Sequence, residues 1–331
     1  MKHYYLPKEG NFYKVNFHCH TTVSDGKHTP AEIKEIYRSM GYDAVCYTDH
    51  EVLVGHENLC DEHFIALHGY EVCVKQNLEA HTGDFQPVYH FNLIAKKQSM
   101  RKMPRFFLAN PSMPGHSAEW LKKLGVYDED DVIETTKYDV DWINDYLAAV
   151  EKAGYLISYN HPEWSLQTAE DVIPLEHVHG FELLNGDCLD FFGNSIICYE
   201  QLLRAGKAPF AIAGDDNHSL RSCGRAFTMI KADTLTYDAL IDGYEHGACY
   251  VSEGPQFLEL YREGEEIVVQ TNKATRVVLR GEYRYHKMVT LPDAEKHEAR
   301  FSYLPRRFGK YFRVELADDE GKKAFSQAYF I

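Results

Sequence analysis

The chain has 331 residues, of which 44% are hydrophobic, and a formal net charge of −15 at pH 7. No charge-free apolar run approaches the roughly 18 residues that a membrane-spanning helix needs, which argues against a helical membrane protein. The acidic balance disfavours a protein that binds long nucleic acids, because such binding depends mainly on Lys and Arg at the phosphates.

The N-terminal residues MKHYYLPKEG contain no apolar segment typical of a secretory signal, so a cytoplasmic location is expected. Eight cysteines are scattered without a CxxC pair, most of them inside apolar stretches. We therefore expect buried, reduced thiols and neither disulfides nor a zinc knuckle.

Short apolar, strand-like runs alternate with helical patterns up to about residue 250, which is typical of β-α units around a parallel sheet or barrel. The first helical pattern, residues 29–41, is well delimited: Thr29 can cap it, Pro30 takes its first position and Gly41 closes it. The expected strands are KVNFHCHT, AVCYTDH, ALHGYEVCV, VYHFNLIAK, YLISYNHP, GFELLNG, PFAIAGDDNH and FTMIKA. The other helical patterns are DWINDYLAAVEKAG, NSIICYEQLLRAGK and LTYDALIDGYEHGAC.

Two segments interrupt this rhythm. Residues 98–138 contain several prolines, a basic cluster and the acidic run DEDD, and an insertion of this kind is usually a functional lid or a mobile segment. After Gly254-Pro255 the chain becomes strand-like with turns such as REGEE and DDEGK. We therefore predict a barrel domain over residues 1–254 and a small all-β domain over residues 255–331.

Metal-ligand residue types recur at the ends of the expected strands. His18 and His20 stand at positions i and i+2, and side chains at this spacing face the same way in an extended chain. Asp216 and His218 repeat the spacing at the last strand, and in barrels the C-terminal strand ends share the face on which the active site forms. One such pair is weak evidence, but several at successive strand ends point to one metal centre.

The motifs FHCHTTVSDGKHTPAEI, YTDH, GYE, HFNLI, NHP and GDDNH resemble the PHP (polymerase and histidinol phosphatase) superfamily of metal-dependent phosphoesterases over about residues 12–254. This resemblance implies a distorted (β/α)7 TIM-like barrel with two or three divalent ions. The ligand positions that it implies are His18, His20, Asp25, His50, Glu71, His90, His161, Asp216 and His218.

The resemblance also implies how the ligands divide. The first ion would take His18, His20, Glu71 and Asp216, and the second would take Glu71, His90 and His161, so that Glu71 bridges them. The third would take Asp25, His50 and His218. Imidazole together with carboxylate suits zinc, manganese or iron(II), and the sequence does not separate these metals.

Two ligand positions have competitors. His81 precedes His90, which is favoured because it lies in an apolar, strand-like run, whereas His81 lies among turn residues. Asp215 competes with Asp216, which is favoured by its spacing from His218; Asp215 would then support a ligand or satisfy a turn.

Further residues are candidates for substrate contacts. Arg221 and Arg225 follow the last metal pair and could clamp a phosphate, or equally pair with acidic residues. His116 in the insertion could protonate a leaving group, although a lone loop histidine is more often only exposed. Tyr47, Trp164 and Tyr250 could line the pocket, although core packing is the commoner role of such aromatics. A third HxH pair, His177 and His179, precedes its strand and is interpreted as structural or surface-exposed.

These features favour a metal-dependent phosphoesterase acting on a small phosphorylated metabolite or nucleotide. A water activated between two ions bridged by Glu71 would be the nucleophile, and no GxSxG elbow or Walker A loop is present. Bound metal ions would offset the acidic balance for such an anionic substrate. The C-terminal stretch YFRVELADDEGKKAFSQAYFI weakly resembles a carbaryl-hydrolase-like branch, so a carbamate or ester hydrolase is the alternative. A non-catalytic, metal-stabilised module is a second alternative, and a nuclease acting on long polymers is disfavoured by the net charge.

Overall fold

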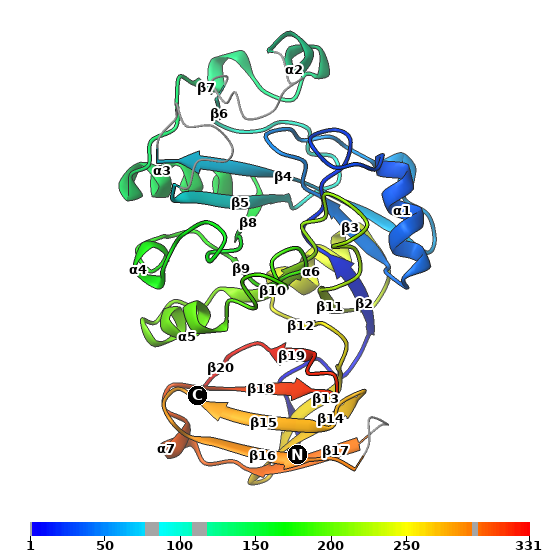
Figure 1. The fold of residues 1–331 in the computed structure, drawn as a ribbon, viewed down its shortest axis with the longest axis vertical. Helices are drawn as coiled ribbons and strands as arrows, with labels where there is room; N and C mark the ends of the chain where they lie inside the picture. The colour runs from blue at the N-terminus through cyan, green and yellow to red at the C-terminus, as the bar shows by residue number, and fades with distance from the viewer. Residues whose placement is uncertain (1, 77–85, 108–117, 293–296) are drawn as a thin grey trace.

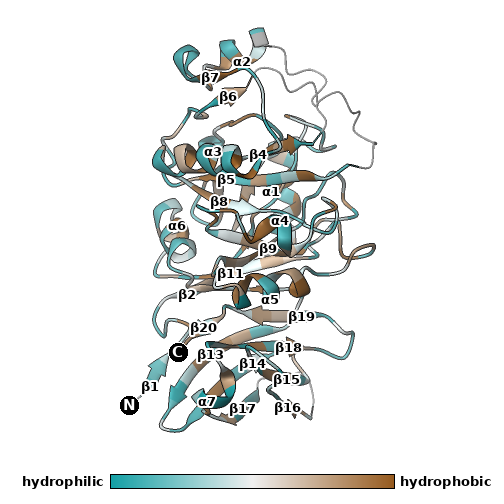
Figure 2. Cartoon of the chain, turned by 90° about the vertical axis from the view of Figure 1, so that its left-hand side faces the viewer, coloured by the Kyte–Doolittle hydropathy of each residue, from teal (hydrophilic) through white to brown (hydrophobic). Residues whose placement is uncertain are grey.

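The computed structural model describes residues 2–76, 86–107, 118–292 and 297–331, which form a mixed α/β structure with a large, many-stranded sheet (Figure 1). The mixed α/β class expected from the sequence is therefore confirmed. Figure 2 shows that the hydrophobic residues concentrate in the strands, while the connecting segments are mostly hydrophilic.

Seven consecutive strands of the large sheet position the candidate ligands, and all of them except β9 carry or precede one. Their spatial order is β10-β9-β8-β5-β4-β3-β2. In chain order they are β2 (Asn11–Asn16), β3 (Ala44–Tyr47), β4 (Ile65–Lys75), β5 (Val88–Ala95), β8 (Tyr155–Tyr159), β9 (Gly180–Asn185) and β10 (Phe210–Gly214). β3, β5, β8 and β9 are buried throughout, and β4 is buried except for its last residue, Lys75, as expected for strands covered on both faces.

Strand β5 departs from the expected parallel pattern, because it runs antiparallel to both of its neighbours, β4 and β8. The remaining neighbours in this run are parallel. The distorted (β/α)7 barrel that the resemblance implies is therefore not confirmed. The two outer strands nevertheless meet, because Phe17 N donates to the oxygen of Ala213 (3.4 Å) and Cys19 bridges Asn217 in parallel.

The long helical patterns predicted from the sequence form helices. The first is α1 (Pro30–Ser39), where Thr29 and Glu32 form a capping box and Pro30 occupies the first turn. The others are α3 (Val140–Lys152), α5 (Ile196–Arg204) and α6 (Tyr237–Glu245). The structure adds two short helices, η1 (Glu57–Leu59) and α4 (Ala169–Val172).

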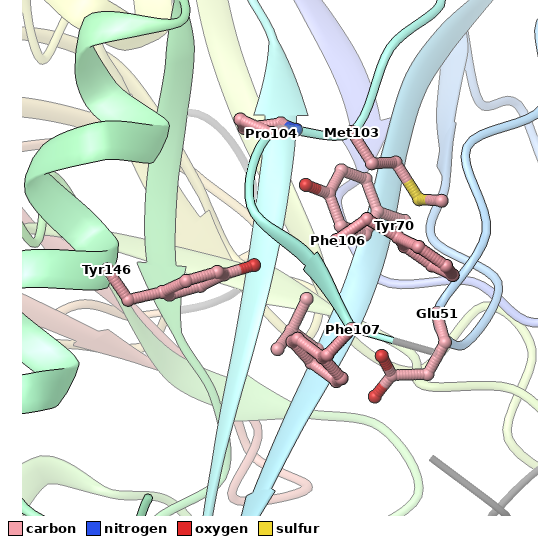
Figure 3. A pocket seen from close by; sticks show the side chains of 8 residues that line it. Glu51, Tyr70, Met103, Pro104, Phe106, Phe107 and Tyr146 are labelled. Carbon is pink, nitrogen blue, oxygen red and sulfur yellow. The ribbon is translucent and has the colours of Figure 1, made fainter. Parts of the chain in front are cut away.

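The described part of the 98–138 insertion packs onto the core. It forms β6 (Phe106–Phe107), α2 (Ala118–Leu124), η2 (Glu129–Asp131) and β7 (Val132–Ile133). Met103, Phe106 and Phe107 are buried there and, with Tyr146 of α3, border a small pocket that also contains the carboxylate of Glu51 (Figure 3). Because these apolar side chains are buried, the described part of the insertion is an integral, packed part of the structure.

The C-terminal segment is rich in strands, as predicted. Its strands are β13 (Gln256–Glu263), β14 (Glu266–Asn272), β15 (Arg276–Gly281), β16 (His286–Thr290), β17 (His297–Ser302), β18 (Tyr311–Ala317), β19 (Lys323–Ser326) and β20 (Tyr329–Phe330), with one short helix, α7 (Pro305–Phe308). The N-terminal strand β1 (Lys2–Tyr4) pairs with β13. β11 (Phe227–Ala232) and β12 (Cys249–Ser252) connect the two parts, because β12 pairs with β19. The domain boundary near residue 254 remains a prediction, and the hydrogen-bonded sheet continues across it.

The eight cysteines have free thiols, and all but Cys60 are buried, as expected. Within the described residues, no helix is long and apolar enough to cross a membrane.

Candidate metal centre

The carboxylate of Glu71 lies at the centre of a ring of histidines. Its oxygens lie between 3.0 and 3.3 Å from one ring nitrogen of each of five histidines, which are His18, His20, His50, His90 and His161. Both Glu71 and His18 are almost completely buried. Five imidazoles from four chain segments therefore point at one carboxylate.

The strand arrangement explains this convergence. His18, His50 and His161 follow the ends of β2, β3 and β8, whereas His90 lies near the start of β5. Because β5 is antiparallel, its start lies beside the later part of β4, where Cys73 pairs with His90. A ligand at the beginning of a reversed strand thus reaches the same place as ligands after the ends of parallel strands.

Two candidate ligands have an unusual backbone conformation. His161 has φ of 24° and Asp216 has φ of 49°, in the left-handed region that residues with a β-carbon rarely adopt. Such strain persists where the surroundings determine it, and it concentrates at functional sites. At Asp216 the turn is held by its N–H, which donates to the oxygen of His18 (2.9 Å).

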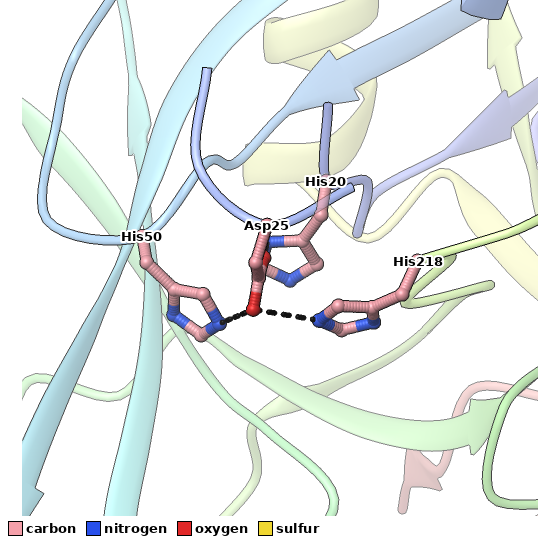
Figure 4. Close-up of side chains that lie close together, drawn as sticks. All are labelled: His20, Asp25, His50 and His218. Atoms are coloured by element: carbon pink, nitrogen blue, oxygen red, sulfur yellow. Dashed lines mark ion pairs between the residues drawn. The ribbon is translucent and has the colours of Figure 1, made fainter. Parts of the chain in front are cut away.

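One group of possible ligands opens towards solvent. His20, Asp25, His50 and His218 bring one ligand atom each to within 4.8 Å of one another, and Asp25 points between His50 and His218 (Figure 4). Asp25 Oδ2 lies 3.3 Å from His218 Nε2 and 3.6 Å from His50 Nε2. The side chains of Asp25 and His218 are more than a third exposed, so this group is the accessible side of the centre.

Three further groups lie deeper and share members. They are His18 with His20 and Glu71, His18 with His161 and Asp216, and Glu71 with His90 and His161. The last is the set expected for the second ion. His20 joins the group expected for the third ion as well as that of the first, so the partition differs there from the expected one. Shared members place the candidate sites next to one another.

Other buried groups orient the ligands. Glu182 accepts a hydrogen bond from His18 Nδ1 (2.9 Å) and another from the backbone N–H of His161 (3.1 Å). Asn160 Nδ2 donates to Glu71 Oε1 (2.9 Å). Such partners of metal-binding side chains hold ring orientation and tautomer.

Asp49 has a separate supporting role. Its carboxylate accepts hydrogen bonds from the N–H and hydroxyl groups of Thr21 and Ser24. It thereby holds the loop that carries Asp25 and stands next to the candidate ligand His50.

The buried carboxylates of the centre depend on positive charge from the groups around them. Burial lowers the pKa of His20, but hydrogen bonds to Asp216 and Glu71 outweigh it and raise that pKa to about 10. Burial raises the pKa of Glu71, but the surrounding histidines outweigh it and hold that pKa well below its usual range. Besides hydrogen bonds from Asn160 and Asn185, the carboxylates of Glu71 and Asp216 are thus stabilised by neighbouring positive charge, which divalent cations would supply in place of protons.

The donor set fits metal ions. The Nε2 atoms of His18 and His20 face each other at 3.1 Å, so at most one of them can donate to the other. His20 Nδ1 is buried and makes no hydrogen bond among the described residues, and Asp216 Oδ1 lies 3.0 Å from His20 Nε2 and 3.3 Å from His18 Nε2. Imidazole nitrogens and carboxylate oxygens that converge and keep free lone pairs are typical ligands of zinc, manganese or iron(II).

The structure separates Asp215 from Asp216. The carboxylate of Asp215 accepts hydrogen bonds from the backbone N–H groups of Gly224, Arg225 and Ala226 and from the Tyr37 hydroxyl. It therefore satisfies a turn, whereas Asp216 faces the histidines. His81 and His116 lie outside the described residues, so their predicted roles are not placed.

The two predicted phosphate-clamp arginines are engaged by aspartates. Arg221 Nη2 lies 2.5 Å from Asp187 Oδ1, and Arg225 forms a two-pronged pair with Asp190 at 2.8 and 2.6 Å. Of the two alternatives for these arginines, the structure shows the pairing with acidic residues. A contact of either arginine with a substrate phosphate stays a prediction.

Two other interpretations concern residues around the motifs. His177 and His179 both pair with Glu151 and lie outside the ligand groups, as interpreted from the sequence. Of the three candidate pocket aromatics, Tyr47 and Tyr250 are core residues, whereas Trp164 is 47% exposed. Glu182 was missed; its signal is a lone acidic residue inside the apolar strand GFELLNG.

No protein-family model matches the chain, and no curated protein matches its sequence. A two-domain protein from Bacteroides vulgatus, named as containing a PHP-like metal-dependent phosphoesterase, is 15% identical over 99% of this chain and 98% of its own, with a TM-score of 0.48. A protein from Bifidobacterium adolescentis, named as a metal-dependent phosphoesterase, is 19% identical over 64% of this chain and 90% of its own, with a TM-score of 0.37. PsfC from Pseudomonas syringae is 16% identical over 71% of this chain and 88% of its own, with a TM-score of 0.40. With identities under 20% and TM-scores under 0.5, the functional assignment depends on the site itself.

Proposed function

We propose that this chain is a metal-dependent hydrolase of the PHP type that cleaves phosphoesters of a small anionic substrate. The observation that carries the proposal is Glu71, whose two oxygens contact ring nitrogens of five histidines in the buried centre. A carboxylate with ligands on both oxygens is suited to bridge neighbouring cations. When bound, such cations lower the pKa of a coordinated water and stabilise negative charge on substrate oxygens.

The chain's own residues divide the work of the site. His18, His161 and Glu71 form its buried side, where Glu182 and Asn160 hold their orientation. His20, Asp25, His50 and His218 form the accessible side, through which a substrate would enter. We assign two or three ions to these groups, with zinc, manganese or iron as candidates. We also propose that the seven strands around the centre are a distorted barrel closed by the contacts of β2 with β10.

A small substrate fits the charge balance of the chain. The formal charge of −15 disfavours a long polyanion, whereas one phosphate group placed at the cations meets local positive charge. The same centre would also activate water for attack on a carbamate or ester carbonyl, so the bond that is cleaved needs a direct test.

The test combines metal analysis with a substrate panel. Purified protein is assayed for bound zinc, manganese and iron, and then for phosphate release from p-nitrophenyl phosphate and phosphorylated metabolites, with aryl carbamates and esters in parallel. We expect bound metal and phosphate release that a chelator abolishes. Turnover of carbamates or esters alone would overturn the phosphoesterase assignment, and bound metal without turnover of any ester would support a non-catalytic module.

A further inference from the structure

Trp164 stands directly beside the candidate metal centre. The centroid of its indole lies 5.3 Å from the ring of His90 and 5.1 Å from that of His161, both of which contact Glu71. The side chain is nevertheless 47% exposed. A large aromatic that contacts two ligand rings and leaves half of its surface open is placed to contact a substrate.

The loop that carries Trp164 is held in position. Ser165 N donates to the oxygen of His161 (3.1 Å), and Gln167 N donates to that of Pro162 (2.9 Å). The Ser195 hydroxyl donates to Glu163 Oε2 at 2.5 Å, which ties this loop to the segment that follows β9. Trp164 therefore occupies a prepared position, and ordering it on binding costs little entropy.

The neighbouring loops also expose apolar side chains. Strands β8, β9 and β10 are adjacent and parallel, so the loops after their ends lie at one edge of the sheet. We define the apolar rim as the exposed apolar residues of these loops. Its members are Trp164, Leu166, Phe191, Phe192 and Leu220.

Both arginines of these loops are paired with aspartates. Arg221 joins the last two loops through its ion pair with Asp187, and its guanidinium lies 5.6 Å from the centre of the Phe191 ring. Asn185 connects this network to the metal centre, because its Nδ2 donates to Asp216 Oδ2 (3.2 Å). With both arginines engaged, the remaining exposed side chains of the rim are apolar and partly aromatic, and exposed apolar surface marks a binding site where such side chains lie together.

We propose that Trp164, with the apolar rim, is a subsite for a planar aromatic group of the substrate, next to the ester that is cleaved. This inference rests on the proposed hydrolase function and adds a substrate class to it, which is phosphoesters that carry an aromatic ring, such as aryl phosphates and nucleotides. An indole binds a planar ring by stacking or edge contact, and such contacts favour aromatic over saturated rings of similar size. The substrate's phosphate would meet the centre while its ring lies against Trp164.

The test compares two esters of similar size, phenyl phosphate and cyclohexyl phosphate, in the wild type, Trp164→Phe and Trp164→Ala. We expect kcat/KM for phenyl phosphate to fall about tenfold or more in Trp164→Ala and to be largely kept in Trp164→Phe. The value for cyclohexyl phosphate should change much less. Tyr283→Ala removes an exposed aromatic outside the rim and is the matched control.

A binding measurement avoids dependence on turnover. Phenylphosphonate, which cannot be hydrolysed as an ester, should quench tryptophan fluorescence in the wild type and lose this effect in Trp164→Phe, where Trp120 and Trp142 remain as background. Metal content is measured in each variant, because Trp164 contacts two candidate ligands. If Trp164→Ala loses metal, the phenylalanine variant and the quenching experiment decide.

The outcomes separate the two proposals. Phosphate release with equal loss for both esters in Trp164→Ala, or equal quenching in Trp164→Phe, overturns the aromatic subsite and leaves the phosphoesterase assignment standing. Quenching that depends on Trp164, without hydrolysis of any phosphoester, overturns the phosphoesterase assignment and supports the aromatic subsite.

Discussion

Glu182 accepts a hydrogen bond of 2.9 Å from Nδ1 of His18, although 164 positions separate the two residues in the chain. The bond directs His18 Nε2 towards Glu71 and Asp216, because the two nitrogens lie on opposite sides of the ring. A carboxylate behind a metal-binding imidazole selects its tautomer and raises its basicity.

Glu182→Gln should therefore weaken metal binding by about 10- to 100-fold while the fold is kept. The measurement is metal affinity by competition with a chelator of known affinity. Glu151→Gln is the matched control, because Glu151 also pairs with two histidines but outside the centre. Equal affinity in Glu182→Gln and the wild type would contradict the positioning role.

Glu71→Gln should have a larger effect, because it removes the charge of the carboxylate shared by the ligand groups. We expect at least two ions to be lost or loosened together and activity to fall by more than about 100-fold, beyond what loss of an orienting partner costs. Metal content per chain and the rate of phosphate release measure this. Survival of both would show that Glu71 does not bridge.

Removal of metal should destabilise the fold. Cations bind the folded centre and not the unfolded chain, so an ion at a hundred times its dissociation constant contributes about 2.7 kcal/mol per site. A chelator should lower Tm by several degrees, and added metal should restore it. Complete metal removal without a change in Tm would argue against cations at these buried groups.

Asp215→Asn should lower the stability of the fold, whereas Asp216→Asn should lower metal binding. Asp215 receives three backbone N–H groups, so replacing one of its oxygens by an amide donor should cost about 1–3 kcal/mol of stability while metal is retained. Asp216→Asn should lower metal content. Chemical denaturation and metal analysis of both variants test this. Equal loss of metal in both variants would contradict the assignment of Asp216, and not Asp215, as the ligand.

His56 and His68 should make stability fall in acid, independently of the metal centre. Burial lowers the pKa of each ring to about 4. The unfolded chain takes up these protons below its ordinary pKa of about 6.5 and the folded chain does not until about 4, so stability present above pH 6.5 is lost as pH falls towards 4.

His56→Phe removes one of these groups and keeps an aromatic ring beside Tyr47. Relative to the wild type it should gain up to about 3 kcal/mol between pH 7 and pH 4, measured by urea unfolding with chelator present throughout. A constant difference between the two proteins across this range would show that His56 does not contribute.

Local chemistry explains how much could be read from the sequence. The Thr29 cap and Pro30 of α1 depend on neighbouring residues, and strand and helix patterns depend on the burial of near neighbours. The candidate ligands were recognisable because their residue types and short spacings, as in His18–His20 and Asp216–His218, are visible in the chain itself.

Only the tertiary structure decided which groups meet. It reversed β5, which brings His90 to Glu71 from the start of a strand, and it placed Glu182 behind His18. It also buried Asp215 in a turn and left Trp164 half exposed beside the centre. These relationships depend on strand direction and on contacts between distant segments. Such non-local contacts cannot be read from the spacing of residues along the chain.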